Sequence, residues 1–316
     1  RIFMNVVAKS VVEDGKPKLV VTVPDEKDNP QLQAFLKVVE KEPKEYVSER
    51  PFRGTVKLGD REYAFVFDAV DREAGGYGVL YFDRNGNGDL NDDEVVESDA
   101  VRQYREDKTL VEKAATEADE AGKKDQKDDA DKEGDEAKQR KLAQAKQRLA
   151  RNRFVYARFP RIDVKVDVGG EKMDYAFFPV LYSYGTRPFA MFTSAMYREG
   201  HIELDGKKRH IALVDFNSNG RFDDEFLCGP TRKADGTSIS FPGAPGDLFY
   251  VDPDGGINPS LAYDLVGPDC RHYVGKLVCI DGRYYDLNVA ASGNKISIEP
   301  SNTAVGRVEN PAKRFG

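Results

Sequence analysis

The chain has 316 residues, the length of one large domain or two ordinary ones. Its net charge of −7 argues against a general surface for nucleic acid or anionic membranes. It has no apolar run of about 18 residues, so no transmembrane segment is predicted. With 18 Phe and 15 Tyr, it can nevertheless fill a sizeable core.

Residues 1–104 are expected to form an N-terminal β unit. Apolar runs at 2–8 and 18–23 suggest strands, and a helical pattern follows Asn29-Pro30 on Leu32, Phe35, Leu36 and Val39. Runs rich in β-branched and aromatic residues then predict an antiparallel meander, with a hairpin turn at Gly59-Asp60. Its strands are expected at 55–58, 63–67 and 78–82.

Residues 105–153 form a charged insertion. Positions 105–148 hold 12 Lys or Arg and 13 Asp or Glu, with no aromatic residue and no proline. Such a composition favours helix and offers little to bury. One interpretation is a coiled-coil-like helical hairpin whose acidic first arm pairs with its basic second arm. The other interpretation is a flexible charged linker.

Residues 154–316 return to a β pattern and are expected to form one or more C-terminal units. Hairpin turns are expected at 169–170, 205–206, 281–282 and 292–293. Strands are predicted at 161–168, 174–180, 189–193, 201–204, 210–214, 247–251, 273–280, 284–289 and 295–299. The predicted fold class is therefore mostly β, a meander or sandwich of strand–loop units with the charged insertion between them.

A weak internal repeat supports two or three related units. Segments 58–63, 204–210 and 280–285 each combine a strand end, a glycine turn and an aromatic residue or histidine opening the next strand. In the first two copies, the next strand leads into an Asp-x-Asn-x-Asn-Gly loop. This shared loop favours duplication over a chance similarity of hairpins.

The first loop, residues 83–94, reads D-R-N-G-N-G-D-L-N-D-D-E and fits the EF-hand calcium pattern at every position. Calcium takes six to eight oxygen ligands, and this spacing turns several of them onto one point. Gly88 allows the sharp bend, and Leu90 is the apolar residue expected to pack inward. The predicted ligands are Asp83, Asn85, Asn87, the backbone carbonyl of Asp89, and Glu94.

The second loop, residues 215–226, reads D-F-N-S-N-G-R-F-D-D-E-F and matches the first half of the pattern. Its twelfth position is Phe226, so Asp224 or Glu225 would have to close the coordination sphere. The predicted ligands are Asp215, Asn217, Asn219, Arg221 through its backbone carbonyl, Asp223 and Glu225. A third stretch, 252–258, is favoured as a plain Asx turn over a degenerate calcium loop.

Both loops follow β runs and not the incoming helix of an EF-hand. They resemble the wider group of Asp-x-Asp-x-Asp-Gly calcium loops, including those of dockerins. The phrase around 213–224 is similar to uncharacterised secreted β proteins of planctomycete-type bacteria. This resemblance implies export and bound Ca²⁺ but brings no known activity.

The cysteines do not define the compartment. Cys228, Cys270 and Cys279 are too few for a disulfide scaffold and lack zinc-site spacing. One disulfide with a free thiol and three thiols both remain open. Asn at loop positions 3 and 5 lowers the ligand charge and predicts weak calcium affinity, on the order of 10⁻⁴–10⁻³ M, which suits an extracellular or periplasmic site.

No catalytic motif stands out, so no catalytic residue is assigned. We expect an exported, calcium-binding structural or interaction protein of the cell surface or extracellular matrix. It could be a subunit of an envelope layer or filament, with copies of itself, other surface proteins or carbohydrate as partners. The alternative is a calcium-stabilised extracellular hydrolase or carbohydrate-binding module.

Overall fold

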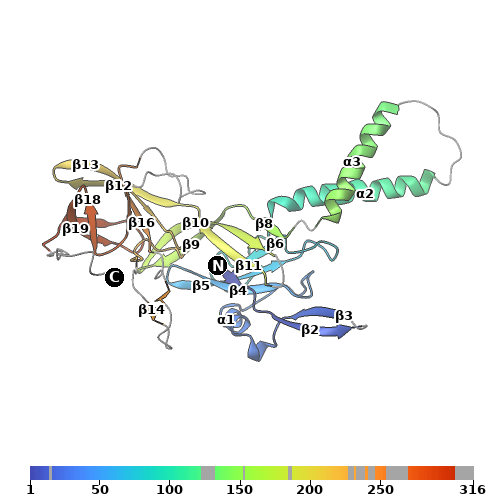
Figure 1. Ribbon diagram of the computed structural model, residues 1–316, viewed down its shortest axis with the longest axis horizontal. Helices are drawn as coiled ribbons and strands as arrows, with labels where there is room; N and C mark the ends of the chain where they lie inside the picture. The colour runs from blue at the N-terminus through green and yellow to red at the C-terminus, as the bar shows by residue number, and fades with distance from the viewer. Residues whose placement is uncertain are drawn as a thin grey trace. The chain divides into compact units, whose positions relative to one another are not determined.

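The computed structural model is mostly β and built from antiparallel sheets, as the sequence predicts (Figure 1). It describes residues 1–13, 16–121, 132–151, 154–183, 187–226, 231–232, 239–240, 246–253 and 270–302. Across these residues, no helix has the length and apolar character needed to cross a membrane.

The chain divides into two compact units. The first holds residues 1–196 and 218–220, and the second holds 197–217 and 221–316. The sequence-based division at residue 153 is different, because it assigns residues 154–196 to the C-terminal part. Those residues join the first unit because their aromatic side chains complete its core.

Two sheets form the body of the first unit. One has the order β4-β5-β6-β7, and the other has the order β1-β11-β10-β8, with β9 also paired to β10. Every pairing in them is antiparallel. Their strands are β1 (Ile2–Phe3), β4 (Phe52–Leu58), β5 (Arg61–Asp68), β6 (Val79–Phe82), β7 (Val96–Glu97), β8 (Tyr156–Arg158), β9 (Ile162–Val168), β10 (Glu171–Tyr182) and β11 (Phe189–Ser194).

Aromatic side chains join these two sheets. Phe65 on β5 lies 5.1 Å from Phe192 on β11, measured between ring centroids. Phe82 on β6 lies 5.1 Å from Phe177 on β10. Phe65, Phe82 and Phe177 are fully buried, and tilted or edge-on packing of this kind stabilises a core beyond its buried area. The first unit is thus sandwich-like.

Smaller elements precede the body. The helix α1 (Pro30–Val38) begins with proline after Asn29, whose side chain accepts a hydrogen bond from the Leu32 N–H. Phe35 of α1 is buried beside Ala64 and Val66 of β5. A 3₁₀ turn, η1 (Glu26–Asp28), comes before α1, and the strands β2 (Val7–Glu13) and β3 (Lys16–Thr22) form a separate, largely exposed hairpin.

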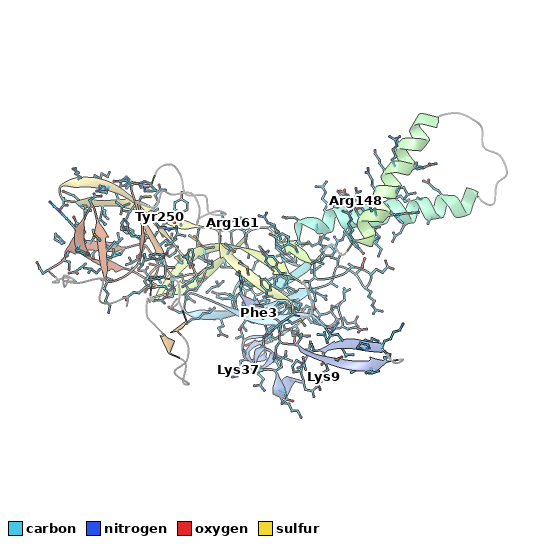
Figure 2. The ribbon with its side chains drawn as sticks, viewed as in Figure 1. Phe3, Lys9, Lys37, Arg148, Arg161 and Tyr250 are labelled. Atoms are coloured by element: carbon cyan, nitrogen blue, oxygen red, sulfur yellow. The ribbon has the colours of Figure 1, made fainter. Side chains whose placement is uncertain are left out.

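The charged insertion contains two helices, α2 (Asp99–Ala121) and α3 (Lys132–Ala150). Ion pairs join them, between Asp107 and Arg148 at 2.6 Å and between Glu117 and Lys138 at 2.8 Å. Figure 2 labels Arg148 on α3. Helix α2 begins six residues before the predicted start of the insertion. Val101 and Tyr104 in its first turns are apolar and pack with Phe154, so these turns belong to the body's core.

The second unit has a four-stranded sheet, a three-stranded sheet and one short hairpin. The sheets have the orders β12-β13-β16-β17 and β18-β19-β20, and the hairpin pairs β14 with β15. Tyr285 of β19 donates a 2.7 Å hydrogen bond to Asp205, which links the two sheets. The strands are β12 (Tyr197–Leu204), β13 (Lys207–Val214), β14 (Thr231–Arg232), β15 (Ile239–Ser240), β16 (Leu248–Val251), β17 (Arg271–Tyr273), β18 (Leu277–Ile280), β19 (Arg283–Val289) and β20 (Ile296–Pro300).

Two predicted strands are each divided. The run at 273–280 becomes β17, which pairs with β16, and β18, which pairs with β19, because the chain bends between them at Gly275 and Lys276. The run at 2–8 becomes β1, which pairs with β11, and β2, which pairs with β3, so its two parts belong to different sheets. Within the described residues, Cys279 is an exposed free thiol and Cys270 is half-buried, whereas Cys228 lies outside them.

The aromatic core predicts a large penalty for truncation. Phe177→Ala should lower the free energy of unfolding by about 3–5 kcal/mol, because it leaves a cavity among Phe82, Phe192 and Tyr175. Chemical denaturation measures this value. Leu19→Ala on the exposed β2–β3 hairpin serves as the control and should change stability by less than about 1 kcal/mol. Equal effects of the two substitutions would contradict the described core.

The hydrogen bonds between Asp71 and the first turns of α2 should make the protein less stable in acid. Although burial alone would raise it, hydrogen bonds from Lys108 and Tyr104 lower the pKa of Asp71 to about 2. The stabilisation is therefore complete above the ordinary pKa of 3.8 and is lost as the pH falls towards 2.

Asp71→Asn should cost about 1 kcal/mol at pH 7, and this difference from the wild type should shrink below about pH 3. Thermal denaturation at both pH values measures it, with Asp174→Asn as a control because that side chain is 89% exposed. A difference that stays constant with pH would exclude the role of Asp71 as an ionised tether.

Candidate metal centres

The first loop begins directly after β6 with a buried carboxylate. Asp83 is fully buried, and its two oxygens accept the N–H groups of Asn87 at 3.0 Å and Gly88 at 2.9 Å. Within the described part of the chain it has no cationic partner. A buried carboxylate usually pairs with a cation or binds a metal, because burying an unpaired charge costs several kcal/mol.

Two amides and a second carboxylate gather around this loop. Asn85 and Asn87 accept backbone N–H groups at 2.9 and 2.7 Å, and those bonds curl the chain. The side-chain NH₂ groups of both residues donate to Asp92, at 3.3 Å and 2.7 Å. The loop therefore brings together Asp83, Asn85, Asn87 and Asp92, a set of oxygen donors that suits calcium.

The side chains of the other two predicted ligands, Asp89 and Glu94, lie near basic residues. The Asp89 carboxylate pairs with Lys41 at 2.7 Å, and the hydrogen bond from Lys41 lowers the pKa of Asp89 to about 2. The motif predicts only the backbone carbonyl of Asp89, and not its side chain, as a ligand. Glu94 is 81% exposed and lies 3.5 Å from Arg84, away from the cluster around Asp92.

The loop also holds other parts of the first unit in place. Gly88 O accepts the N–H groups of Glu40 at 2.8 Å and Lys41 at 3.1 Å, just after α1. Leu90 is buried with Phe35 and Val66, as the sequence predicts for the eighth position. The first loop therefore packs against Phe35 of α1 and Val66 of β5 and bonds to the chain that follows α1.

The second loop begins in the second unit, directly after β13. Asp215 is fully buried after β13, and Asn217 donates to Asp224 at 3.1 Å. Phe222 is buried and donates its N–H to the Ala291 carbonyl. Residues 218–220 group with the first unit, where the Ser194 N–H donates to the Ser218 hydroxyl and the Gly59 N–H to the Asn219 carbonyl.

A carboxylate distant in sequence supports the second loop. Asp247 is fully buried and accepts the N–H groups of Phe216 at 3.1 Å and Asp224 at 2.9 Å. Burial and the nearby charge of Asp215 raise the pKa of Asp247 to about 8. Asp93 has the matching position in the first loop, where it accepts the Arg84 N–H at 2.9 Å, and burial raises its pKa as well.

Three further predicted ligands of the second loop are an ion pair and an exposed residue. The Arg221 and Asp223 side chains pair with each other at 2.9 Å, and Glu225 is exposed. Phe226, at the twelfth position, stacks on Tyr273 with ring centroids 4.4 Å apart. In the third stretch, Asp252 accepts the His210 N–H and pairs with Arg209, whereas 254–258 lie outside the described residues.

Both loops share a position that sequence reasoning missed in the first loop. Asp92 and Asp224 stand at position 10 and meet the position-3 asparagine in each loop. After the glycine, this is the one position that is Asp in both loops, so aligning the two copies could have revealed it. Asp247 gives no such signal, because it lies 32 residues after Asp215.

Comparisons with known proteins add no assignment. Neither a family model, a curated protein nor a solved structure matches this chain. Within the described residues, no group of three or more His, Cys, Asp or Glu side chains is gathered for a metal. The candidate centres therefore depend on mixed carboxylate, amide and backbone oxygens.

The tight bend of the first loop predicts a sharp steric effect. Gly88 has a φ of +79°, and an added Cβ would lie 2.6 Å from the Val38 carbonyl oxygen. Gly170 has a similar φ of +83° but open space around it. Gly170→Ala is therefore a matched control for backbone strain alone, which costs about 1–2 kcal/mol.

Gly88→Ala should destabilise the protein by about 1–3 kcal/mol more than Gly170→Ala, because backbone atoms must move to relieve the overlap. Chemical denaturation of both variants measures the difference. Equal losses would mean that the loop does not pack against the end of α1.

Proposed function

We propose that the protein is an exported calcium-binding structural or interaction protein, in which the ions stabilise the two strand–loop units. The buried Asp83 carboxylate, which lacks a cationic partner among the described residues, is the observation that carries the proposal. The repeated loop geometry gives further support. Asp83 and Asp215 are both fully buried, and the sixth-position glycines, Gly88 and Gly220, have φ values of +79° and +78°.

The role of the ion in this proposal is structural and not regulatory. Each loop has a buried apolar residue at position 8, Leu90 or Phe222, directly next to a predicted ligand. The backbone around each also bonds to a segment distant in sequence, near Lys41 or at Ala291. An ion that rigidified such a loop would stabilise the core itself. Weak sites of this kind are filled at extracellular calcium concentrations.

The proposed setting follows from these sites and from the charged helices. We place the protein at the cell surface, in the extracellular matrix or in the periplasm. Its proposed partners are copies of itself or other surface proteins, and α2 and α3 would offer a solvated surface for assembly. The resemblance to secreted β proteins with Asp-x-Asp-x-Asp-Gly loops agrees with this proposal.

Calorimetric titration of the chelator-stripped protein with Ca²⁺ tests it directly. We expect two sites with dissociation constants of about 10⁻⁴–10⁻³ M. Asp83→Asn and Asp215→Asn should each remove one site, whereas Glu62→Gln, on the exposed part of β5, should retain both. At calcium concentrations of 100 times Kd, one site should stabilise the fold by about 2.7 kcal/mol.

The same titration identifies the closing carboxylate of the first loop. Asp92→Asn should weaken the first site more than Glu94→Gln, because only Asp92 lies with the amides of Asn85 and Asn87. The reverse order would mean that Glu94 leaves Arg84 when calcium binds. An absence of binding by the wild-type protein would overturn the proposed function.

A further inference from the structure

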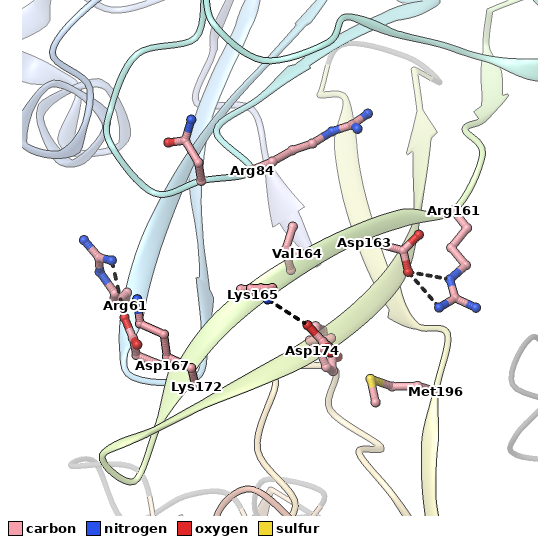
Figure 3. A pocket seen from close by; sticks show the side chains of 12 residues that line it. Arg61, Arg84, Arg161, Asp163, Val164, Lys165, Asp167, Lys172, Asp174 and Met196 are labelled. Carbon is pink, nitrogen blue, oxygen red and sulfur yellow. Dashed lines mark hydrogen bonds and ion pairs between the residues drawn. The ribbon is translucent and has the colours of Figure 1, made fainter.

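A pocket with a volume of about 690 Å³ lies in the first unit, beside the first loop. Its size is within the range of small-molecule binding sites. Figure 3 shows the β9–β10 ribbon that forms much of its wall, with Arg84 on the loop across from it. Five basic side chains line it: Arg61, Arg84, Arg161, Lys165 and Lys172.

Three carboxylates also line this pocket, and each is paired with one of the cations. Arg161 pairs with Asp163 at 2.7 Å, Arg61 with Asp167 at 3.4 Å, and Lys165 with Asp174 at 3.9 Å (Figure 3). Five cations and three carboxylates leave two positive charges in excess. This local excess stands out in a chain whose net charge is −7.

The two excess charges belong to Lys172 and Arg84. Lys172 forms no ion pair with any described residue. Arg84 lies 3.5 Å from Glu94, but Glu94 is 81% exposed, so solvent screens this pair. The Arg84 Nε is buried and has no hydrogen-bond acceptor among the described residues. A ligand carboxylate could therefore replace Glu94 at the Arg84 guanidinium at little cost in free energy, and it could bind in a bidentate way.

The aspartates that line the pocket restrict the class of anion that it can bind. Asp163 and Asp174 are 70% and 89% exposed, and their oxygens can accept hydroxyl hydrogens but would repel a densely charged polyanion. Asn85 adds an amide that can both donate and accept, and Val164 and Met196 add apolar surface. The lining suits a ligand with one or two negative charges, several hydroxyl groups and an apolar face.

We propose that this pocket binds a small acidic saccharide, a sugar or disaccharide that carries one or two carboxylates. Arg84 and Lys172 bind the carboxylates, and the aspartates of the β9–β10 ribbon accept hydrogen bonds from the hydroxyls. This site goes beyond the proposed calcium-binding function and requires no bound metal.

Titration of the full-length protein with digalacturonate, in buffer with a chelator, tests the proposal. The neutral analogue digalactose, the acidic dipeptide Asp-Asp and inorganic phosphate are titrated in parallel. We expect digalacturonate to bind at least about tenfold more tightly than digalactose, the factor that corresponds to one charge-assisted hydrogen bond. It should also bind more tightly than the dipeptide and phosphate.

Variants locate the site. Lys172→Gln and Arg84→Gln should each weaken digalacturonate binding about tenfold, with an unchanged melting temperature. Lys9→Gln removes a basic side chain on β2, outside the pocket, and should leave the affinity unchanged (Figure 2). Lys172 lies outside both calcium loops, so its variant separates this site from the metal sites.

Three results would overturn the proposal. Equal affinity for digalactose would exclude recognition of the carboxylates, and tighter binding of the dipeptide or phosphate would assign the pocket to another anion. Unchanged binding in both pocket variants would place the ligand elsewhere. Because the buffer holds no free calcium, none of these results depends on whether the loops bind Ca²⁺.

Discussion

The first unit depends on how the chain satisfies one buried carboxylate. Asp83 leaves β6 at a fully buried position, and the loop must curl back so that Asn87 and Gly88 can give it their N–H groups. That curl requires a left-handed residue, which Gly88 supplies. Once the bend has formed, Leu90 reaches the core beside Phe35, and the Gly88 carbonyl meets the chain after α1. The buried carboxylate, the turn and the core contact of Leu90 are therefore coupled to one another.

The two loops use different residues to accept the same backbone N–H group. The N–H at position 2 needs an acceptor in each, and Asp93 provides it from within the first loop. In the second loop the acceptor is Asp247, which directly precedes β16 and lies 32 residues after Asp215. The N–H at position 2 of the first loop thus finds its acceptor locally, whereas that of the second loop requires β13 and β16 to be paired already. Loop closure over a longer chain costs more entropy, so the second loop is expected to form later in folding.

The sequence predicts the strands well where apolar alternation and glycine turns agree. The turns at 169–170, 205–206 and 281–282 all have positive φ values, as their residues require. Alternation alone cannot show that β8–β11 pack against β4–β7, because that depends on which aromatic rings meet across the sheets, such as Phe65 and Phe192. The motif predicts that Asp, Asn and Gly lie together at the start of each loop, and in the first loop Asp83 accepts the N–H groups of Asn87 and Gly88. It could not place Glu94 in solvent or bring Asp247 to Phe216, since both follow from tertiary contacts.

The fixed points of α2 and α3 lie near one end of each helix. Tyr104 and Lys108 bond to Asp71, and Arg148 bonds to Asp107, which is almost fully buried. Farther along, the described part of α2 is rich in charged residues and alanine. These residue types favour helix and do not need a buried partner. Equal numbers of turns could therefore be added to or removed from both helices without disturbing Phe154 and its neighbours. The body would then carry a spacer whose reach can change over evolution independently of the sheets beneath it.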